Sequence, residues 1–396
     1  MAVGALASAV MGCAVGPNFV RPAAPAVTHY ANGTDPVRTP SAQGTSQQLN
    51  VGEQVAADWW HVFNSSQLDG LIKAALINNP GLLAAQASLQ QSENSLRAGY
   101  GIFYPSLSAD AAATRERYSP LRAGSDAPPA IFNLFTLSAS VSYALDVFGG
   151  QRRTVEALGA AVDVQRADEE GVYLTLVANI VNTVVAEAAY RAEIDATQEL
   201  IGLQREQVRL AQVQVTAGTA AYSTVLSLQS QLATYEATIP QLEQKLSQSD
   251  DLLASLSGHV PAEWTPPQVR LSDLTLPADL PVSLPSDLVR QRPDILAAEA
   301  VAHAASANIG VATAALLPSI DLSGNYSANG MATQTLFAKS GRSWSAGGDI
   351  SAPLFSGGTL WFSRKAAING YDQAMASYRA TVLSAFAQVA DTLRAL

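Results

Sequence analysis

The chain has 396 residues, of which 48% are hydrophobic and only 14% are charged, and its 33 acidic and 23 basic side chains give a net charge of −10. The apolar fraction excludes intrinsic disorder. The acidic balance excludes a nucleic-acid-binding protein, because no basic stripe offsets it. The single cysteine excludes an intramolecular disulfide framework and a cysteine-rich metal site. No run of 18 apolar residues occurs, so the sequence predicts no transmembrane helix and leaves a soluble, a surface-anchored or a β-barrel protein.

The N-terminal residues are typical of a bacterial lipoprotein signal peptide. Residues 1–12 contain a short apolar run that cannot span a bilayer, and a small residue precedes Cys13. Val10, Gly12 and Cys13 fit the lipobox, in which the cysteine is lipidated. The alternative is a buried cysteine in an N-terminal helix. We expect 1–12 to be a signal-peptide remnant and 13–50, rich in Pro, Ala, Thr and Gly, to be an extended tether.

The chain contains an internal duplication. The segment that begins at Pro80 recurs at Pro293, and YPSL (104–107) recurs as LPSI 213 residues later. Each copy then has a Gly-Gly pair, the second in FSGG (355–358). Each copy is therefore predicted to hold a helix, a β region, a glycine break and a long helix. We expect a first repeat over 51–258, a linker over 259–290 and an incomplete second repeat over 291–396.

Two segments in each copy alternate between apolar and polar residues, as strands with one face in water do. They are 105–117, 135–147, 319–329 and 343–354. At about 11–13 residues they match tilted membrane-spanning strands better than soluble ones. The polar positions are expected to face a water-filled lumen. They include Ser138, Ser140, Ser142, Asp321, Asn325 and Asp349.

Four strands cannot close a barrel, and hydrocarbon does not tolerate open sheet edges, so the missing strands must come from other chains. The segments 118–130 and 331–341, which join the paired strands, are predicted to be loops outside the cell. A soluble β-sandwich is the alternative, and the long helices between the strands disfavour it.

Long helices are predicted after the first strand pair. Residues 151–216 contain no proline and would span about 100 Å as one helix. Residues 222–257 carry a heptad seam, which is typical of coiled-coil packing. The turn between the two helices is expected at 216–219, and Pro240 is expected to kink or interrupt the second helix. A soluble coiled-coil rod is the alternative, but it does not account for the strands.

No catalytic or metal-binding motif is present, so the sequence predicts no enzyme, no cofactor and no metal site. The four histidines are scattered, at positions 29, 61, 259 and 303. Asp250 and Asp251, beside the heptad seam, are expected on a solvated face.

Several longer stretches carry a family resemblance. The most specific is LPSDLVRQRPDILAAEA (284–300), followed by ANIGVATAALLPSIDLSG (307–324). The others are CAVGPNFVRP (13–22), DWWHVFNSSQLDGLIKAALINNP (58–80), IPQLEQKLSQSDDLLASLSG (239–258), PLFSGG (353–358) and YRATVLSAFAQVADTL (378–393). Over essentially its whole length the chain resembles the TolC-like outer membrane factors, the outer-membrane channels of tripartite efflux pumps, and among them the NodT-type lipoproteins.

The resemblance implies a mainly α fold with membrane β structure, in which two repeats each supply long helices and two strands. It implies a homotrimer with a twelve-stranded β-barrel and a periplasmic α-helical tunnel, anchored through Cys13 in the lipid of the outer membrane. The linker 259–290 would be equatorial, in the belt that surrounds the family's tunnel. Drugs or other small toxic solutes would leave through this duct without being chemically changed. The implied partners are a periplasmic adaptor (membrane fusion) protein and an inner-membrane RND-type pump. A non-transporting structural or adhesive coiled-coil protein of the envelope is the alternative.

In the family, the adaptor docks at the tips of the helical hairpins. The resemblance implies that the corresponding docking segment here is 214–224. The candidate residues are Gln214, Gly218 and Thr224. Gln214 and Thr224 depart from the family, which often has a basic residue before the turn and an Asp after it. The second repeat also stops inside its descending helix at Leu396. We therefore expect a C-terminally truncated chain that lacks the return helix and the acidic gate of the family.

Overall fold

A computed structural model of the chain describes residues 14–30, 33, 35–41, 46–53, 55–120, 124 and 126–396. The expected signal-peptide remnant and Cys13 lie outside the described residues. The chain divides into two compact units, each built from segments of both repeats. The first comprises residues up to 22, 90–164 and 298–380, and the second comprises 23–89, 165–297 and 381–396.

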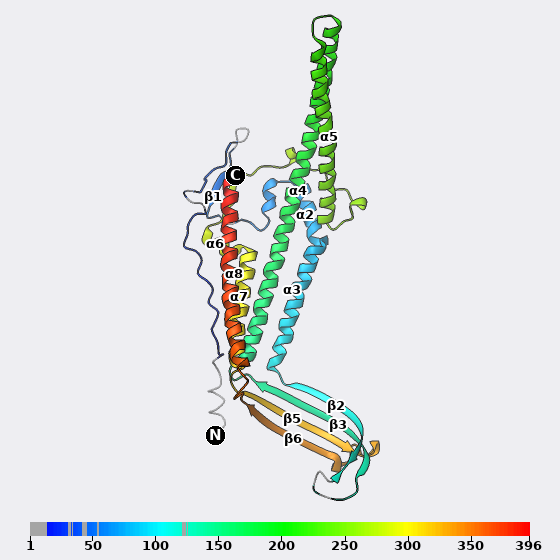
Figure 1. The fold of residues 1–396 in the computed structure, drawn as a ribbon, viewed down its shortest axis with the longest axis vertical. Helices are drawn as coiled ribbons and strands as arrows, with labels where there is room; N and C mark the ends of the chain where they lie inside the picture. The colour runs from blue at the N-terminus through cyan, green and yellow to red at the C-terminus, as the bar shows by residue number, and fades with distance from the viewer. Residues whose placement is uncertain are drawn as a thin grey trace. The chain divides into compact units, whose positions relative to one another are not determined.

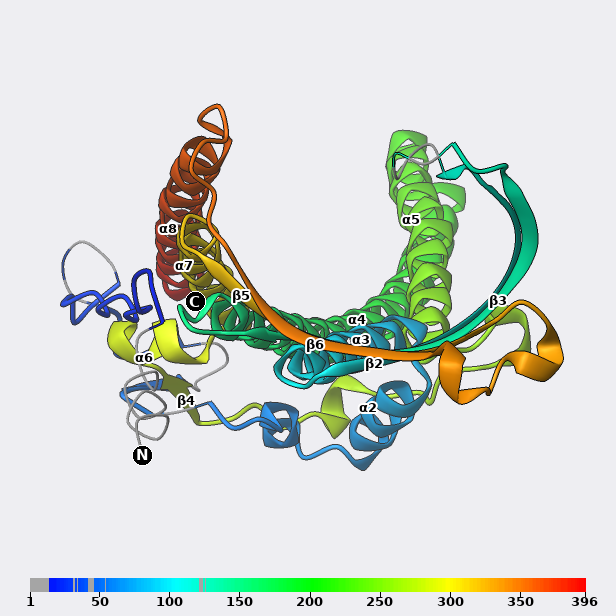
Figure 2. The same ribbon diagram turned by 90° about the horizontal axis from the view of Figure 1, so that it is seen from below.

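The first unit contains a curved four-stranded sheet (Figures 1 and 2). Its strands are β2 (Ser106–Tyr118), β3 (Ala130–Leu145), β5 (Ser319–Gly330) and β6 (Arg342–Ser351). They follow the order β2-β3-β5-β6, and every neighbouring pair is antiparallel. All four predicted strands are therefore present, with ends that differ by up to five residues. The pairing of β3 with β5 joins the two repeats in one sheet.

The helices that flank the sheet repeat as the duplication predicts. α3 (Pro80–Gly99) and α7 (Pro293–Ala314) each begin at the proline that recurs, because proline is favoured in the first turn of a helix. After each strand pair a Gly-Gly break leads into a long helix, α4 (Gly150–Thr216) or α8 (Thr359–Ala395). Gly149 has a φ of 78°, and a side chain there would collide with the backbone of Ala14. This position therefore requires glycine. In the first unit α7 and α8 lie side by side (Figures 1 and 2), joined by a hydrogen bond from Arg364 to Thr313.

The second unit contains the hairpin of α4 and α5 (Tyr222–Leu256). The seam positions recur every three or four residues from Val225 to Leu256. All of them are buried or half-buried, while most of the residues between them are exposed. This confirms the predicted coiled-coil packing. Gly218, with a φ of 76°, forms the predicted turn. The expected interruption at Pro240 does not occur, because α5 runs through this residue as one helix. Proline removes a single backbone donor, and the seam on either side is packed.

The core of the second unit lies where the base of the hairpin meets α2 (Ser66–Asn78). Leu68, Ile72, Ile180 and Leu253 are fully buried there. Ser65 caps α2, since its side chain accepts a hydrogen bond from the Leu68 amide. Asn79 caps α3 in the same way, and its side-chain amide donates to the Leu256 carbonyl at 2.9 Å.

The segments before and after the first repeat pair with each other. β1 (Gln48–Val51) lies parallel to β4 (Asp279–Val282), followed by α6 (Pro285–Gln291). The end of the segment expected to be a tether is therefore a strand. Short 3₁₀ turns complete the regular structure, and two of them occupy the predicted loop 331–341. They are Trp59–Phe63, Tyr100–Phe103, Pro261–Glu263, Leu271–Asp273, Thr333–Thr335 and Lys339–Gly341.

Two helices, α4 and α7, are long and apolar enough by length and composition to cross a membrane. Their most apolar windows are 44% and 39% buried inside the protein, and core helices of soluble proteins meet the same criterion. The prediction of no transmembrane helix did not identify these helices because it counted uninterrupted apolar runs, whereas an average tolerates isolated polar residues.

Candidate functional site

The register of the sheet places all six predicted lumen residues on one face. Cross-strand partners share a face, and alternate residues of a strand share it too. Ser140 pairs with Asn325, and Asp321 pairs with Asp349. Ser138 and Ser142 pair with serines of β5. The sheet therefore brings these residues together from three strands and both repeats.

Hydroxyl and amide groups form cross-strand hydrogen bonds over this polar face. The hydroxyls of Ser108 and Ser140 lie 2.7 Å apart. Thr136 donates to the side-chain oxygen of Asn329 at 2.9 Å. The face also carries four carboxylates and, within these fully described strands, no basic side chain. The carboxylates are Asp110, Glu116, Asp321 and Asp349. Such a surface suits contact with water and with mobile cations.

The opposite face is apolar and exposed in the single chain. Leu107 is 79% exposed, Trp344 77% and Ile350 70%. Ala109, Ala139, Tyr326 and Trp344 form one cross-strand row on this face. Large exposed apolar surface of this kind marks contact with lipid or protein rather than water. The edge strands β2 and β6 have one neighbour each among the described residues, so their outer backbone groups are open to pairing.

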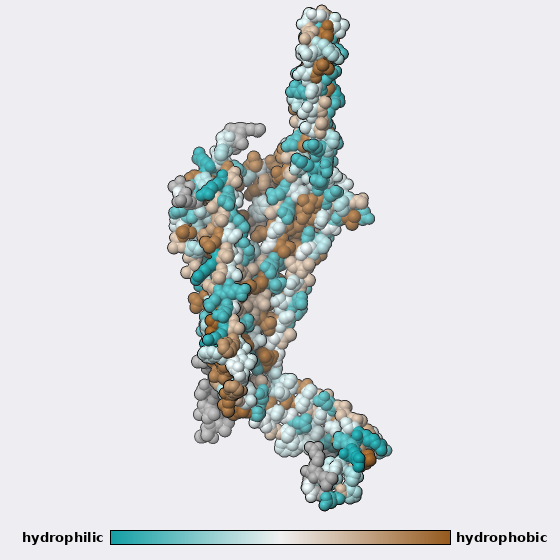
Figure 3. Space-filling model, in the orientation of Figure 1, coloured by the Kyte–Doolittle hydropathy of each residue, from teal (hydrophilic) through white to brown (hydrophobic). Residues whose placement is uncertain are grey.

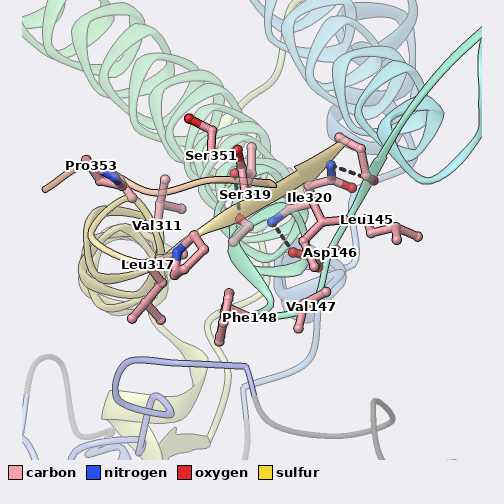
Figure 4. A pocket seen from close by; sticks show the side chains of 17 residues that line it. Leu145, Asp146, Val147, Phe148, Val311, Leu317, Ser319, Ile320, Ser351 and Pro353 are labelled. Atoms are coloured by element: carbon pink, nitrogen blue, oxygen red, sulfur yellow. Dashed lines mark hydrogen bonds between the residues drawn. The ribbon is translucent and has the colours of Figure 1, made fainter. Parts of the chain in front are cut away.

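A cavity of about 410 Å³ lies where the sheet ends and the helices begin (Figure 4). Asp146 follows β3 and accepts hydrogen bonds from the backbone amides of Gln151 and Arg152. The Arg152 side chain also donates to this carboxylate, at 3.1 Å. The negative charge at the first turn of α4 stabilises the helix and joins it to the strand. The Asp146 carboxylate is thus engaged in structure.

The chain segment that follows Cys13 is held at the same strand–helix junction. Arg153 is only 4% exposed, and it donates to the Val15 carbonyl at 3.2 Å and to the Asn18 side chain at 2.7 Å. The Val15 amide donates in turn to the Phe148 carbonyl at 2.9 Å. Sequence analysis missed this contact, because 138 residues separate Arg153 from Val15 and no local pattern links them.

The end of the α4–α5 hairpin carries the three predicted docking residues, all of them exposed. The Gln214 carbonyl accepts from both the amide and the hydroxyl of Thr219. Gly218 occupies the turn, and Thr224 lies in the first turn of α5. Apolar side chains are exposed beside them, Val213 at 56% among them, and Figure 3 shows this apolar surface near the end of the hairpin. A surface of this mixed character suits contact with another protein.

A second buried charged side chain, after Arg153, lies at the base of the hairpin. Glu187 is fully buried, and its carboxylate accepts two hydrogen bonds from Arg191 at 3.0 and 2.6 Å. Arg191 also approaches Asp250 at 3.5 Å. Burial raises the pKa of the Glu187 carboxyl above its usual range, although Arg191 opposes the shift. The expectation of a solvated face is correct for Asp251 and wrong for Asp250, because Asp250 packs toward α4.

The stretch that resembles the family most specifically, LPSDLVRQRPDILAAEA (284–300), contains side chains that link two helices. Arg292 donates to Asp294 at 2.7 Å and to Gln388 of α8 at 2.9 Å. Asp294 accepts from the Ile295 amide at the start of α7. Burial raises the pKa of the Asp294 carboxyl, but the hydrogen bonds of Arg292 outweigh burial and hold the pKa below its usual range. The motif therefore ties α7 to α8.

The histidines do not converge on one another. His61 contacts Asp69, and His303 contacts Glu156. His259 stacks on Trp264. His29 lies beside the Thr28 hydroxyl. Within the described part of the chain, no group of three or more His, Cys, Asp or Glu side chains could hold a metal ion.

Comparison with known proteins identifies the family. The family model described as "Outer membrane efflux protein" matches residues 71–259 and 284–396. The pyoverdine export outer membrane protein OpmQ of Pseudomonas aeruginosa is 29% identical over 357 residues, which cover 88% of this chain and 74% of that protein. The toluene efflux pump outer membrane protein TtgC of Pseudomonas putida is also 29% identical, over 97% of this chain and 78% of that protein.

The solved structure of the outer-membrane channel OprN has the same fold. Its TM-score to this chain is 0.84 at 26% identity, over 96% of this chain and 82% of the OprN chain. The predicted efflux channel in the outer membrane and the absence of an enzymatic role agree with these relatives, and the alternative of a non-transporting coiled-coil protein does not. The chain belongs to the outer membrane efflux protein family and is an outer-membrane channel of an efflux pump.

Proposed function

We propose that the channel is a homotrimer in which each protomer gives four strands to a twelve-stranded barrel and its long helices to a periplasmic tunnel. The observation that carries this proposal is the register of the sheet, which separates a polar from an apolar face over four strands of 10–16 residues. Open edges at β2 and β6 are not tolerated in lipid, so neighbouring protomers must pair there. Three protomers give an even number of strands within the usual range.

In this arrangement the polar face lines the lumen. Solutes pass along the row of serines and the carboxylates Asp321 and Asp349, while the apolar face meets lipid. A wide, wet lumen selects weakly, so the choice of cargo lies with the pump. We expect drugs and other small toxic solutes as cargo and an RND-type pump in the inner membrane as the energy source.

Two further partners of the protomer are proposed. At the end of the hairpin we propose docking of a periplasmic adaptor protein through Gln214, Gly218 and Thr224. For the N-terminal segment we propose a lipid attached to Cys13, as in NodT-type lipoproteins. The hydrogen bond of Val15 to Phe148 at the end of the sheet supports the lipid, because Val15 is two residues after Cys13 and the sheet is the proposed membrane part.

Thiol labelling tests the assignment of the two faces. Cysteine is introduced at Ser140 or, as the matched control on the opposite face, at Ala139, and each variant is reconstituted in lipid vesicles. A water-soluble maleimide should label the Ser140→Cys variant and leave the Ala139→Cys variant unlabelled. The unsubstituted chain measures any background from Cys13. Equal labelling of both positions, or a monomeric mass in detergent, would refute the trimeric barrel.

A further inference from the structure

Three arginines lie on the apolar face of the sheet, at the end that is remote from the helices. Arg115 pairs with Asn133 and Arg117 with Ile131, on the face that carries Leu107. Arg342 pairs with Ala328, two residues before Trp344 on the same face of β6. Basic residues on a face made mainly of aliphatic, aromatic and glycine residues need an explanation.

Arg115 and Arg342 lie equally far along their own strands from the end of the sheet that joins the helices. In β2 eight residues separate Leu107 from Arg115, and in β6 eight residues separate Ile350 from Arg342. Eight residues rise about 26 Å along a strand, or about 20 Å along the membrane normal at a tilt of 40°. An apolar band on a membrane barrel is about 25 Å tall. The arginines therefore lie at the far border of the band, where the polar headgroups begin.

Two aromatic residues lie on the apolar face, two positions along the strands from Arg342 and its partner Ala328. Tyr326 and Trp344 are direct cross-strand partners on the apolar face, and both are exposed. Tyrosine and tryptophan concentrate at the membrane–water interface of membrane proteins.

The charges of the three arginines are not neutralised within the described part of the chain. All three are exposed, and none forms an ion pair with a described residue. Arg342 donates only to the neutral Phe337 carbonyl, at 3.1 Å. The nearby carboxylates, Asp110 and Glu116, lie on the opposite face of the sheet. A planar guanidinium matches the geometry of a phosphate group better than any other side chain.

We propose that Arg115, Arg117 and Arg342 form a basic rim that binds the phosphate groups of an anionic lipid in the outer leaflet. This inference rests on the proposed barrel, which makes the apolar face the lipid face. In a trimer the rim would present nine guanidinium groups around the channel. It would fix the depth of the barrel in the membrane, because clusters of basic residues at a headgroup layer attract anionic lipids.

The experiment uses the full chain, assembled in detergent and exchanged into phosphatidylcholine vesicles with or without bisphosphorylated lipid A. The rim variant carries Arg115→Gln, Arg117→Gln and Arg342→Gln. The control variant carries the same charge change on helices, at Arg97, Arg205 and Arg209. Retained lipid A per protein is measured after re-extraction in mild detergent. Oligomeric mass and maleimide labelling at Ser140→Cys are measured in the same samples.

The rim variant should retain less lipid A, by roughly fivefold for each arginine removed, while the control variant matches the unsubstituted chain. A second variant with lysine at the three positions should keep most of the lipid A, because it keeps the charge. Equal retention by the rim variant and the control would overturn the proposal. So would displacement of lipid A by millimolar inorganic phosphate, since the rim would then bind free phosphate rather than a lipid surface.

The mass and the labelling separate the two proposals. If the chain forms a trimer and Ser140→Cys is labelled, but the unsubstituted chain retains no more lipid A than the rim variant, only the proposed basic rim is wrong. If the chain is monomeric or Ser140 is not labelled, the barrel itself is wrong, whatever lipid is retained.

Discussion

Arginine at the neighbouring positions 139 and 140 of β3 tests which face of the sheet meets hydrocarbon. Ala139 lies on the apolar face, midway between Phe135 and Tyr143 and four residues from each. That spacing is about 13 Å along the strand in either direction, so position 139 is near the centre of the apolar band. Ser140 is the next residue and faces the polar side.

The two substitutions should differ clearly in free energy of unfolding. An arginine on the lipid face of a barrel costs about 2–4 kcal/mol near the midplane. Ser140→Arg places the charge in water instead and loses the 2.7 Å contact between the Ser140 and Ser108 hydroxyls. One such hydrogen bond is worth about 0.5–1.5 kcal/mol. We therefore expect Ala139→Arg to destabilise the barrel by about 0.5–3.5 kcal/mol more than Ser140→Arg.

Denaturant titration of the chain in lipid vesicles measures both values, with reversibility shown by refolding. Ala139→Leu is the control for size, because it adds bulk beside Tyr326 without adding charge. It should change stability far less than Ala139→Arg. Equal costs for the two arginine variants, or a larger cost at position 140, would contradict the assignment of lipid and lumen faces.

Two further predictions concern the second unit. Burial raises the pKa of the Glu187 carboxyl in the folded chain above the unfolded value of 4.5. Below that value the carboxyl is protonated in both folded and unfolded chains, and its contribution to stability is complete. The contribution is lost as the pH rises through the raised pKa of the folded chain. Glu187→Gln should therefore weaken the loss of stability between pH 4.5 and 8 in denaturant titrations, and an unchanged pH dependence would disprove this role. Leu253→Ala should destabilise the chain by about 2–5 kcal/mol because Leu253 is fully buried, whereas Leu252→Ala, at a neighbour that is 49% exposed, should cost under about 0.5 kcal/mol; similar losses in thermal unfolding would count against the described core.

Local patterns predicted the elements and their faces well. The period-two alternation in 135–147 and 319–329 predicted β3 and β5 and placed Ser140 and Asn325 on a polar face. The heptad seam predicted the contact side of α5. The helix is not interrupted at Pro240, because a single proline in a packed coiled coil does not end the helix.

Other features had no sequence signal. The contact of Arg153 with Val15 joins residues that no sequence period links. No local pattern shows that the Glu187 carboxyl is buried. The same holds for the parallel pairing of β1 with β4, whose partners Leu49 and Leu280 are far apart in the chain. The basic rim needed the register as well, because only the pairing of Arg342 with Ala328 shows which face that arginine shares.

The amino-acid sequence by itself determined which segments are strands or long helices and which side of each strand is polar, because side chains alternate between faces with a period set by the local backbone. It also determined the duplication, through the recurrence of Pro80 and Pro293. Only the tertiary structure decided that β3 pairs with β5, that Arg153 holds the N-terminal segment, and that Arg115 and Arg342 lie on the same face. The physical reason is that these contacts join residues distant in the chain, and their partners are chosen by packing in space rather than by any local pattern.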